Sequence, residues 1–416
     1  MDSATHDPAT AAAPGTAPSA QGRGGPEAST GRVPPLVAPG PELTEDEYRR
    51  FSRHILIPEI GVTGQRRLKN AKVLVIGAGG LGSPALLYLA AAGVGTLGII
   101  DDDVVDASNL QRQVIHGTSR IGRLKTESAR ETIADLNPET AVVLHNERLT
   151  RENILEIFAD YDLVLDGTDN FATRYLVNDA AAILGKPYVW GSILRFDGQV
   201  SVFWRGHGPT YRDLYPEAPP AGSVPSCAEG GVFGVLCAQI GSVMVAEAIK
   251  LITGTGEPLL GRVLMLDALA MSWREIRLRP DPAVQQPAEL LEDYPAFCGI
   301  APPSGDEVPA VSASELRDLL AARAAGGPGF RLIDVREAGE AEIVSIDGAE
   351  LAPRGEILSG EVDLPRDEPL ILHCKSGGRS AEVLRHLRAQ GYDDVRHLDG
   401  GITAWVREVE PGKPLY

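Results

Sequence analysis

Glycines and charged side chains suited to binding a nucleotide gather in the first half of the chain. An apolar run, Lys72 to Ile76, leads into a loop with glycines at four positions, and an Ala/Leu-rich stretch follows. This pattern predicts a strand, a tight turn and a helix whose free N–H groups bind a phosphate. The glycines that permit the turn and the close approach of a phosphate are Gly77, Gly79, Gly80 and Gly82. NAD, FAD and ATP all remain candidates on this motif alone.

Charged residues farther along the chain narrow the choice of nucleotide. Asp101 ends a second apolar run about 20 positions after the glycine loop, where an acidic side chain binds a ribose hydroxyl. Arg112 and Lys125 would neutralise a triphosphate and its departing pyrophosphate, a task that hydride transfer does not require. Asp169 follows a third apolar run, and a carboxylate there would hold Mg²⁺ together with phosphate oxygens. The set favours ATP, although a nicotinamide-dependent oxidoreductase would share the glycine loop and Asp101.

A second reactive group is a cysteine near the C-terminal end. The apolar run 369–373 leads directly into Cys374-Lys-Ser-Gly-Gly-Arg379, and a helical pattern follows. Backbone N–H groups and the positive end of that helix would face the thiol, while Lys375 and Arg379 add positive charge. These surroundings favour the thiolate, so we expect Cys374 to act as a nucleophile.

Alternating apolar runs and helical patterns would position both groups on parallel sheets. We expect an α/β fold, with a Rossmann-like, mostly parallel sheet that binds ATP, followed by a smaller α/β domain. The predicted division is a disordered tail at 1–42, a nucleotide domain at 43–280, a linker at 281–309 and a second domain at 310–416. The apolar run 231–246 contains Gln239 and Ser242, which favours a buried helix over a membrane span.

Composition excludes several classes of protein. The formal net charge of -18, from 39 basic and 57 acidic residues, opposes binding to nucleic acids and to anionic membranes. The four cysteines lack the short-range pairing of a disulfide framework. The N-terminus lacks the basic start and apolar core of a signal peptide. We therefore expect a cytoplasmic protein with reduced thiols.

The motifs of the first half, in this order and spacing, resemble the MoeB/ThiF family, which activates ubiquitin-like proteins. The matching segments are Arg50-Phe-Ser-Arg53, the glycine loop, Asp101, Asn109-Leu-Gln-Arg-Gln113, Lys125 and Asp166-Gly-Thr-Asp-Asn170. The resemblance covers about 41–280. It implies that ATP adenylates the C-terminal glycine of a small ubiquitin-like sulfur carrier protein ending in Gly-Gly.

The resemblance also implies a role for each matching residue. Gly80 would bind phosphate and Asp101 ribose, Arg112 and Lys125 would act on the phosphates, and Asp169 would hold Mg²⁺ through ATP. Arg53 matches an arginine that reaches into the neighbouring subunit's site, so a homodimer is implied. The implied nucleotide contacts are Gly77, Gly79, Gly80, Gly82, Asp101, Ser108, Asn109, Leu110, Gln111, Arg112, Lys125, Asp169 and Asn170.

Two further positions follow from the same resemblance. Cys227 matches a loop cysteine that can form a thioester or acyl disulfide with the carrier, and an inert packing role stays equally open. Many family members also hold a structural zinc with two Cys-x-x-Cys pairs. The matching segments here are Thr210-Tyr-Arg-Asp213 and Pro295-Ala-Phe-Cys298, which supply one thiol of four. We therefore expect no structural zinc.

The C-terminal part resembles the rhodanese family. Support comes from Asp334-Val-Arg-Glu337, Ile346-Asp-Gly-Ala349 and Gly400-Gly-Ile402 with Trp405, while Ser345 departs from the histidine of many members. The resemblance covers about 311–416 and implies that Cys374 carries a persulfide, cradled by loop amides and Arg379. Cysteine phosphatases are the alternative, but their loop places five residues between cysteine and arginine. The four residues here make a smaller cradle that suits a sulfur atom.

Together the two resemblances imply one reaction sequence. The carrier is adenylated, and sulfur from the Cys374 persulfide then gives its thiocarboxylate, for molybdopterin or a related sulfur-containing metabolite. A cysteine desulfurase or thiosulfate would supply the sulfur. Two alternatives stay open: adenylylation alone with a regulatory rhodanese domain, and a scaffold that binds ubiquitin-like partners without catalysis.

Overall fold

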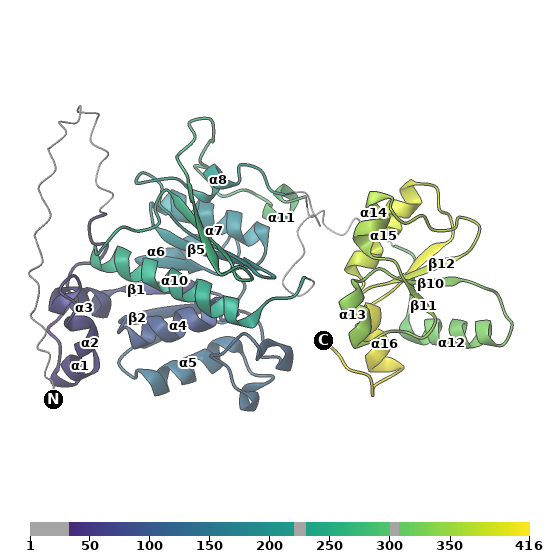
Figure 1. The fold of residues 1–416 in the computed structure, drawn as a ribbon, viewed down its shortest axis with the longest axis horizontal. Helices are drawn as coiled ribbons and strands as arrows, with labels where there is room; N and C mark the ends of the chain where they lie inside the picture. The colour runs from purple at the N-terminus through teal and green to yellow at the C-terminus, as the bar shows by residue number, and fades with distance from the viewer. Residues whose placement is uncertain (1–32, 220–229, 300–307) are drawn as a thin grey trace, which may run out of the picture.

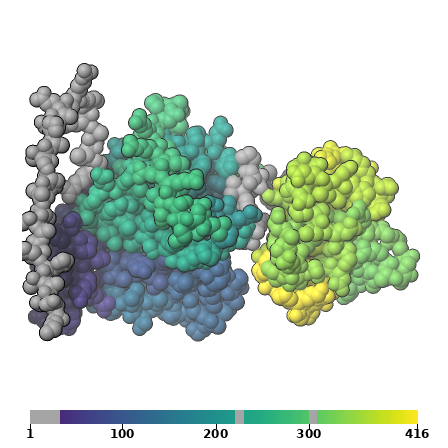
Figure 2. Space-filling model, viewed as in Figure 1, coloured from purple at the N-terminus to yellow at the C-terminus, as the bar shows by residue number. Residues whose placement is uncertain are grey.

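The computed structural model describes residues 33–219, 230–299 and 308–416. Across these residues the strands form an eight-stranded sheet, in the order β3-β2-β1-β4-β5-β6-β7-β8, and a five-stranded sheet, in the order β11-β10-β12-β13-β9. Each sheet carries helices, and Figure 2 shows the two parts as separate globules. The predicted fold class, a large mostly parallel domain followed by a smaller α/β domain, is confirmed.

The larger sheet changes from parallel to antiparallel pairing along its width. In its parallel part, β1, β2 and β4 are mostly apolar and buried because helices cover both faces, whereas β3 at the edge of the sheet is partly exposed. The antiparallel part ends in β8, whose side chains are mostly exposed. The parallel strands are β1 (Lys72–Ile76), β2 (Thr96–Ile100), β3 (Ala141–His145), β4 (Leu163–Asp166) and β5 (Tyr188–Leu194), and the antiparallel ones are β6 (Asp197–Phe203), β7 (Arg262–Asp267) and β8 (Ser272–Arg277).

Helices cover this sheet on both faces (Figure 1). One apolar cluster joins α4 and α10 to the sheet, and a second joins α6 and α7 to its other face. The helices are α1 (Glu45–Arg50), α2 (Ser52–Ile55), α3 (Gly61–Asn70), α4 (Gly82–Ala91), α5 (Lys125–Leu136), α6 (Ile154–Ala159), α7 (Phe171–Leu184), α8 (Tyr211–Leu214), α10 (Gly234–Thr253) and α11 (Tyr294–Phe297), with 3-10 turns η1 (Ala107–Asn109) and η2 (Thr118–Arg120).

Helix α10 contains most of the apolar run 231–246, for which the sequence predicts a buried helix and not a membrane span. It is long and apolar enough to cross a bilayer by length and composition, but it packs against α4 and strands β5 and β6. Leu236, Ile240 and Met244 on its inner face are fully buried or nearly so. It is therefore a core helix of this domain.

Two segments outside the predicted nucleotide domain pack against it. Residues 33–42, assigned from the sequence to the tail, contact α10 through the Leu36 N–H, which donates to the Leu251 carbonyl (2.9 Å), and Val37 is buried. Within the predicted linker, α11 places Tyr294 and Cys298 in the cluster around α6 and α7.

The smaller sheet puts its reactive loop after a central strand. Strand β12 lies between β10 and β13, and every described pairing in this sheet is parallel. Its strands are β9 (Ala310–Val311), β10 (Arg331–Asp334), β11 (Ala349–Leu351), β12 (Leu370–His373) and β13 (Val395–Leu398), and its helices are α12 (Ala313–Ala324), α13 (Ala338–Ile343), α14 (Arg354–Ser359), α15 (Gly378–Ala389) and α16 (Gly401–Glu408).

Candidate active sites

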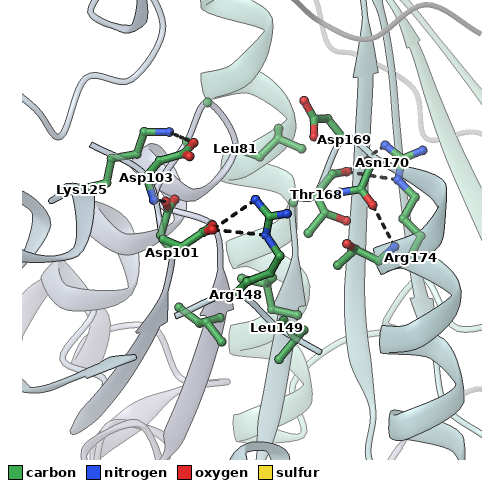
Figure 3. A pocket seen from close by; sticks show the side chains of 18 of the residues that line it. Leu81, Asp101, Asp103, Lys125, Arg148, Leu149, Thr168, Asp169, Asn170 and Arg174 are labelled. Carbon is green, nitrogen blue, oxygen red and sulfur yellow. Dashed lines mark hydrogen bonds and ion pairs between the residues drawn. The ribbon is translucent and has the colours of Figure 1, made fainter. Parts of the chain in front are cut away.

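A cavity of about 710 Å³ lies at the carboxyl ends of β1, β2 and β4 (Figure 3). The chain leaves β1 toward β2 on one side and returns as β4 on the other, and such a switch in strand order is where parallel sheets bind ligands. Sites for small molecules commonly have volumes of roughly 300–1,000 Å³. The position and the size therefore suit a nucleotide.

The glycine loop forms one wall of this cavity. Gly77 has a left-handed φ of 86°, and its N–H donates to the Ile100 carbonyl (2.8 Å), which fixes the loop against β2. A side chain at Gly82 would place its Cβ 1.8 Å from the Gly77 oxygen. Only glycine therefore lets α4 begin this close to β1, with its N-terminus at the cavity.

Asp101 ties the end of β2 to the glycine loop. Its Oδ2 accepts a hydrogen bond from the Ala78 N–H (2.8 Å), and its Oδ1 accepts one from the Asp103 N–H (2.9 Å). Burial raises the pKa of Asp101, and the nearby Lys125 ammonium opposes that shift. A carboxylate held in this way lines the cavity where a ribose hydroxyl would donate to it.

Basic side chains line the same cavity. Lys125 is the first residue of α5, and its Nζ donates to Asp103 Oδ2 (2.7 Å). Arg112 extends from the turn after η1, and its guanidinium donates to the Ser108 carbonyl (3.2 Å). Both residues, together with Asn109 and Gln113, line the cavity. The arrangement places positive charge beside the N-terminus of α4, where phosphates would lie.

The segment after β4 carries Asp169 on the opposite side of the cavity (Figure 3). The buried Asp166 accepts a hydrogen bond from the Thr168 N–H (3.0 Å), and burial raises the pKa of this carboxyl. Arg174 donates to the Thr168 carbonyl from Nε (3.1 Å) and Nη2 (2.8 Å). Asn170 caps α7 by accepting from the Thr173 N–H (2.9 Å). These bonds hold Asp169 at the cavity.

Other residues of the predicted nucleotide set lie elsewhere. Ser108, Leu110 and Gln111 are not among the residues that line the cavity. The Ser108 hydroxyl bonds to Asp106 (2.6 Å), and Gln111 lies against Gly234 at the start of α10. Arg53 is exposed on α2 and also lies outside this lining. Cys227 lies outside the described residues.

The structure adds cavity residues that the sequence did not indicate. Arg148 and Leu149 follow β3, and Arg148 pairs with Asp102 at the cavity edge (3.1 Å). Their place just after a parallel strand could have indicated them, because ligands bind at the carboxyl ends of such strands. Arg174 and Tyr294 also line the cavity, and Tyr294 comes from a segment with no recognisable pattern.

The two segments that match the zinc-binding pairs of the family, 210–213 and 295–298, do not provide a site that suits zinc. Arg212 donates from Nε and Nη2 to the two oxygens of the buried Asp179 (2.7 Å each), and the Tyr294 hydroxyl donates to the same carboxylate (2.9 Å). The Arg212 guanidinium also lies 5.0 Å from the ring centroids of Tyr175 and Phe297. Burial raises the pKa of the single thiol, Cys298, and so disfavours the thiolate that zinc requires. The two segments that would supply the ligands are thus joined by a buried guanidinium instead of a set of thiolates.

Cys374 directly follows β12, under the first turns of α15 and α16. Its Sγ accepts hydrogen bonds from the Gly377 N–H (3.1 Å) and the Ser380 hydroxyl (3.6 Å). Its carbonyl accepts from the Ile402 N–H at the start of α16 (2.8 Å). The residue is only 1% exposed. The predicted loop amide at the sulfur is therefore in place, on a cysteine enclosed by its own loop.

Arg379 has a partner other than the Cys374 sulfur. Its guanidinium makes a two-fold hydrogen bond to Glu340 on α13 (2.7 Å each), and the Tyr416 hydroxyl donates to the same carboxylate (2.8 Å). Burial disfavours the Glu340 carboxylate, but the bonds from Arg379 and Tyr416 outweigh burial and lower its pKa. Lys375 places its Nζ 4.6 Å from the Tyr416 ring centroid. A direct role of Arg379 at the sulfur stays a prediction.

Comparisons with known proteins match both parts of the chain. The ThiF family model matches residues 51–288, and the rhodanese-like domain model matches residues 312–408. The probable adenylyltransferase/sulfurtransferase MoeZ of Mycobacterium tuberculosis is 56% identical over 92% of this chain and 99% of that protein. The adenylyltransferase and sulfurtransferase MOCS3 of Drosophila yakuba is 41% identical over 90% of this chain and 86% of that protein.

A solved structure repeats the fold of the first domain. The crystal structure of E. coli MccB aligns with a TM-score of 0.52 and 22% identity, and the alignment covers 60% of this chain and 76% of that chain. The family, fold class and enzyme class predicted from the sequence are thereby confirmed. The chain belongs to the ThiF family and, with its rhodanese-like domain, is an adenylyltransferase and sulfurtransferase.

Proposed function

We propose that the first domain adenylates the C-terminal glycine of a ubiquitin-like sulfur carrier protein, and that Cys374 then supplies sulfur to give the carrier thiocarboxylate. The observation that carries this proposal is the cavity itself, in which Lys125 and Arg112 line one side and Asp169 the other, beside the N-terminus of α4. Hydride transfer would leave these cations without a task. A reaction that expels pyrophosphate uses all three.

The cavity residues that the sequence predicted have separate roles in the adenylation. Asp101 accepts from the ribose, the loop at Gly80 approaches the phosphates, and Arg112 and Lys125 stabilise the negative charge of the departing pyrophosphate. Asp169 would hold Mg²⁺, which neutralises phosphate charge when bound and commonly takes one or two carboxylates with phosphate oxygens. The carrier carboxylate attacks the α-phosphorus, and pyrophosphate leaves.

The sulfur step uses a persulfide on Cys374. Its terminal sulfur attacks the acyl-adenylate, a carbon–sulfur bond forms, the carbon–oxygen bond breaks and AMP leaves. A second thiol then attacks Cys374 Sγ and breaks the sulfur–sulfur bond, which releases the thiocarboxylate and leaves a disulfide. Cys227 or an external thiol would supply this second sulfur. The product serves molybdopterin or a related sulfur-containing metabolite, with a cysteine desulfurase or thiosulfate as donor.

The proposed assembly is a cytoplasmic homodimer in which Arg53 acts in the partner's site. Support comes from its exposure on α2, outside the lining of its own cavity. Mixing Arg53→Ala protein with Asp169→Ala protein tests this. Subunit exchange would rebuild one complete site per heterodimer and restore part of the activity. If the mixture stays inactive although heterodimers form, the assignment across subunits is wrong.

The decisive experiment weighs the carrier after reaction. The chain is incubated with ATP, Mg²⁺, a sulfur source and a carrier ending in Gly-Gly, and mass spectrometry detects replacement of one oxygen by sulfur. Lys125→Ala should abolish both this exchange and carrier-dependent ATP–pyrophosphate exchange, whereas Cys374→Ala should abolish only the sulfur gain. If Cys374→Ala still gains sulfur, the rhodanese domain is regulatory and the alternative holds. If no carrier supports ATP–pyrophosphate exchange, the adenylation proposal fails.

A further inference from the structure

A short chain of polar groups leads inward from the Cys374 sulfur. Ser380, in the first turn of α15, is fully buried, and its Oγ lies 3.6 Å from Cys374 Sγ. The same Oγ lies 3.3 Å from Nδ1 of His397 on β13, the strand beside β12. His397 is 8% exposed. The sulfur is thus joined to a buried imidazole through one hydroxyl.

The Ser380 hydroxyl has a single hydrogen, so the neighbour that receives it determines whether the sulfur gains a hydrogen bond. Ser380 Oγ has three neighbours, the Cys374 sulfur, His397 Nδ1 and the Gly377 carbonyl (3.0 Å), but it can donate to one at a time. If His397 Nδ1 carries a hydrogen, it donates to Oγ, and the hydroxyl hydrogen is left for the sulfur or for Gly377. A negative sulfur is the stronger acceptor, because charge-assisted hydrogen bonds exceed neutral ones.

We propose that His397 is a positioning residue for sulfur transfer: its Nδ1–H donates to Ser380 Oγ and so orients the Ser380 hydroxyl to donate to the Cys374 thiolate. With the Gly377 N–H, the thiolate then accepts two hydrogen bonds inside the protein. The proposal rests on the sulfurtransferase assignment of this domain. It does not depend on the carrier or on ATP.

The surroundings of His397 keep it a neutral donor at pH 7. Burial lowers its pKa, Asp399 opposes this shift, and Arg385 on α15 adds to it. Strand β9 on the other side presents Ala310 and Val311, which do not titrate. A neutral imidazole has one N–H, and a donor at Nδ1 satisfies the buried Ser380 oxygen.

The hydrogen bonds from His397 through Ser380 act on the sulfur whenever Cys374 is an anion. In sulfur loading from thiosulfate, the thiolate attacks the outer sulfur, a new sulfur–sulfur bond forms, the bond inside thiosulfate breaks and sulfite leaves with the electron pair. In sulfur release to cyanide, a carbon–sulfur bond forms, the persulfide bond breaks and the electron pair returns to Cys374. The hydroxyl therefore increases the fraction of thiolate available for loading and stabilises the thiolate that leaves in the release step.

The test is a double-mutant cycle in the full chain, with turnover from thiosulfate to cyanide as the readout. Hydrogen bonds to charged groups contribute about 1.5–3 kcal/mol, so Ser380→Ala should slow turnover at least about tenfold. His397→Leu should cause a similar loss in the wild-type background and no further loss in the Ser380→Ala background. His397→Asn, whose amide keeps an N–H near the Nδ1 position, should stay within about threefold of wild type.

A spectroscopic readout separates this role from a structural one. The ultraviolet absorbance of the Cys374 thiolate at neutral pH, taken against Cys374→Ala, should fall in Ser380→Ala and His397→Leu and persist in His397→Asn and Ser380→Thr. His386→Leu, a change of a histidine on α15 that bonds only to Gln390 among its described contacts, is the control. Equal losses from His397→Leu in both backgrounds, or an Asn variant as slow as the Leu variant, would overturn the proposal.

Discussion

Replacing Gly82 with alanine should disable the nucleotide cavity while leaving the rest of the domain folded. The added Cβ would lie 1.8 Å from the Gly77 oxygen, whereas ordinary contacts begin near 3.4 Å, so the start of α4 and the end of β1 must separate by about 1.6 Å. Overpacking of this kind costs about 1–3 kcal/mol of the unfolding free energy. A displacement of 1 Å at reacting groups can slow a reaction about 100-fold.

Carrier-dependent ATP–pyrophosphate exchange measures this effect directly. We expect Gly82→Ala to lower the exchange rate about 100-fold or more, and calorimetry should show weakened ATP binding. The matched control is Gly117→Ala, because Gly117 has an extended φ of -125° and an added Cβ there meets no atom within 4 Å. That variant should keep wild-type exchange and stability. The steric reasoning is refuted if Gly82→Ala exchanges pyrophosphate within about threefold of wild type.

Three further predictions concern the stability of the two domains and the absence of zinc. Arg212→Met leaves the carboxylate of Asp179 buried without its cation, so the unfolding free energy in urea should fall by about 3–5 kcal/mol. Adding Asp179→Asn to the same variant removes the unpaired charge and should recover part of this loss. A loss below about 1 kcal/mol for Arg212→Met would contradict a stabilising role for the ion pair. Metal analysis of the purified protein should find no stoichiometric zinc, and one tightly bound equivalent would overturn this prediction. Burial lowers the pKa of His373 to about 4, below the unfolded value of about 6.5, so the unfolded chain binds the extra proton between these pH values. The unfolding free energy of the C-terminal domain should therefore be highest above about pH 6.5 and fall by about 3 kcal/mol toward pH 4, which hydrogen exchange measures. His373→Leu should reduce this dependence of the unfolding free energy on pH. If the dependence is unchanged in that variant, other groups cause it.

Local signals explain why the two reactive loops were predictable. Each loop joins a buried apolar strand to a helix through glycines. The strand appears in the sequence as an apolar run, the turn as glycines and the helix as a helical pattern, and the three signals are adjacent. Gly77 and Gly377 have the positive φ angles that such loops require. Parallel pairing then brings Asp101 and Asp169 to one edge of the sheet, which follows from strand order alone.

Contacts between distant segments explain what the sequence did not indicate. Within the motif 108–113, Asn109, Arg112 and Gln113 line the cavity, but Ser108 and Gln111 do not, because Ser108 bonds to Asp106 and Gln111 lies against Gly234 at the start of α10. Tyr294 reaches the cavity only because α11 packs on α7. The link from Cys374 through Ser380 to His397 depends on the pairing of β12 with β13, which no pattern within one segment encodes.

The burial of Cys374 limits the shape of the molecule that can accept its sulfur. The residue is 1% exposed, and backbone from its own loop and from the start of α16 surrounds it. A folded surface cannot contact such an atom directly, so a partner must present its reacting group on an extended segment, and a tail of glycines does so with backbone alone. For the proposed carrier, the absence of side chains in a Gly-Gly tail would then help its terminus to approach the sulfur that Cys374 carries.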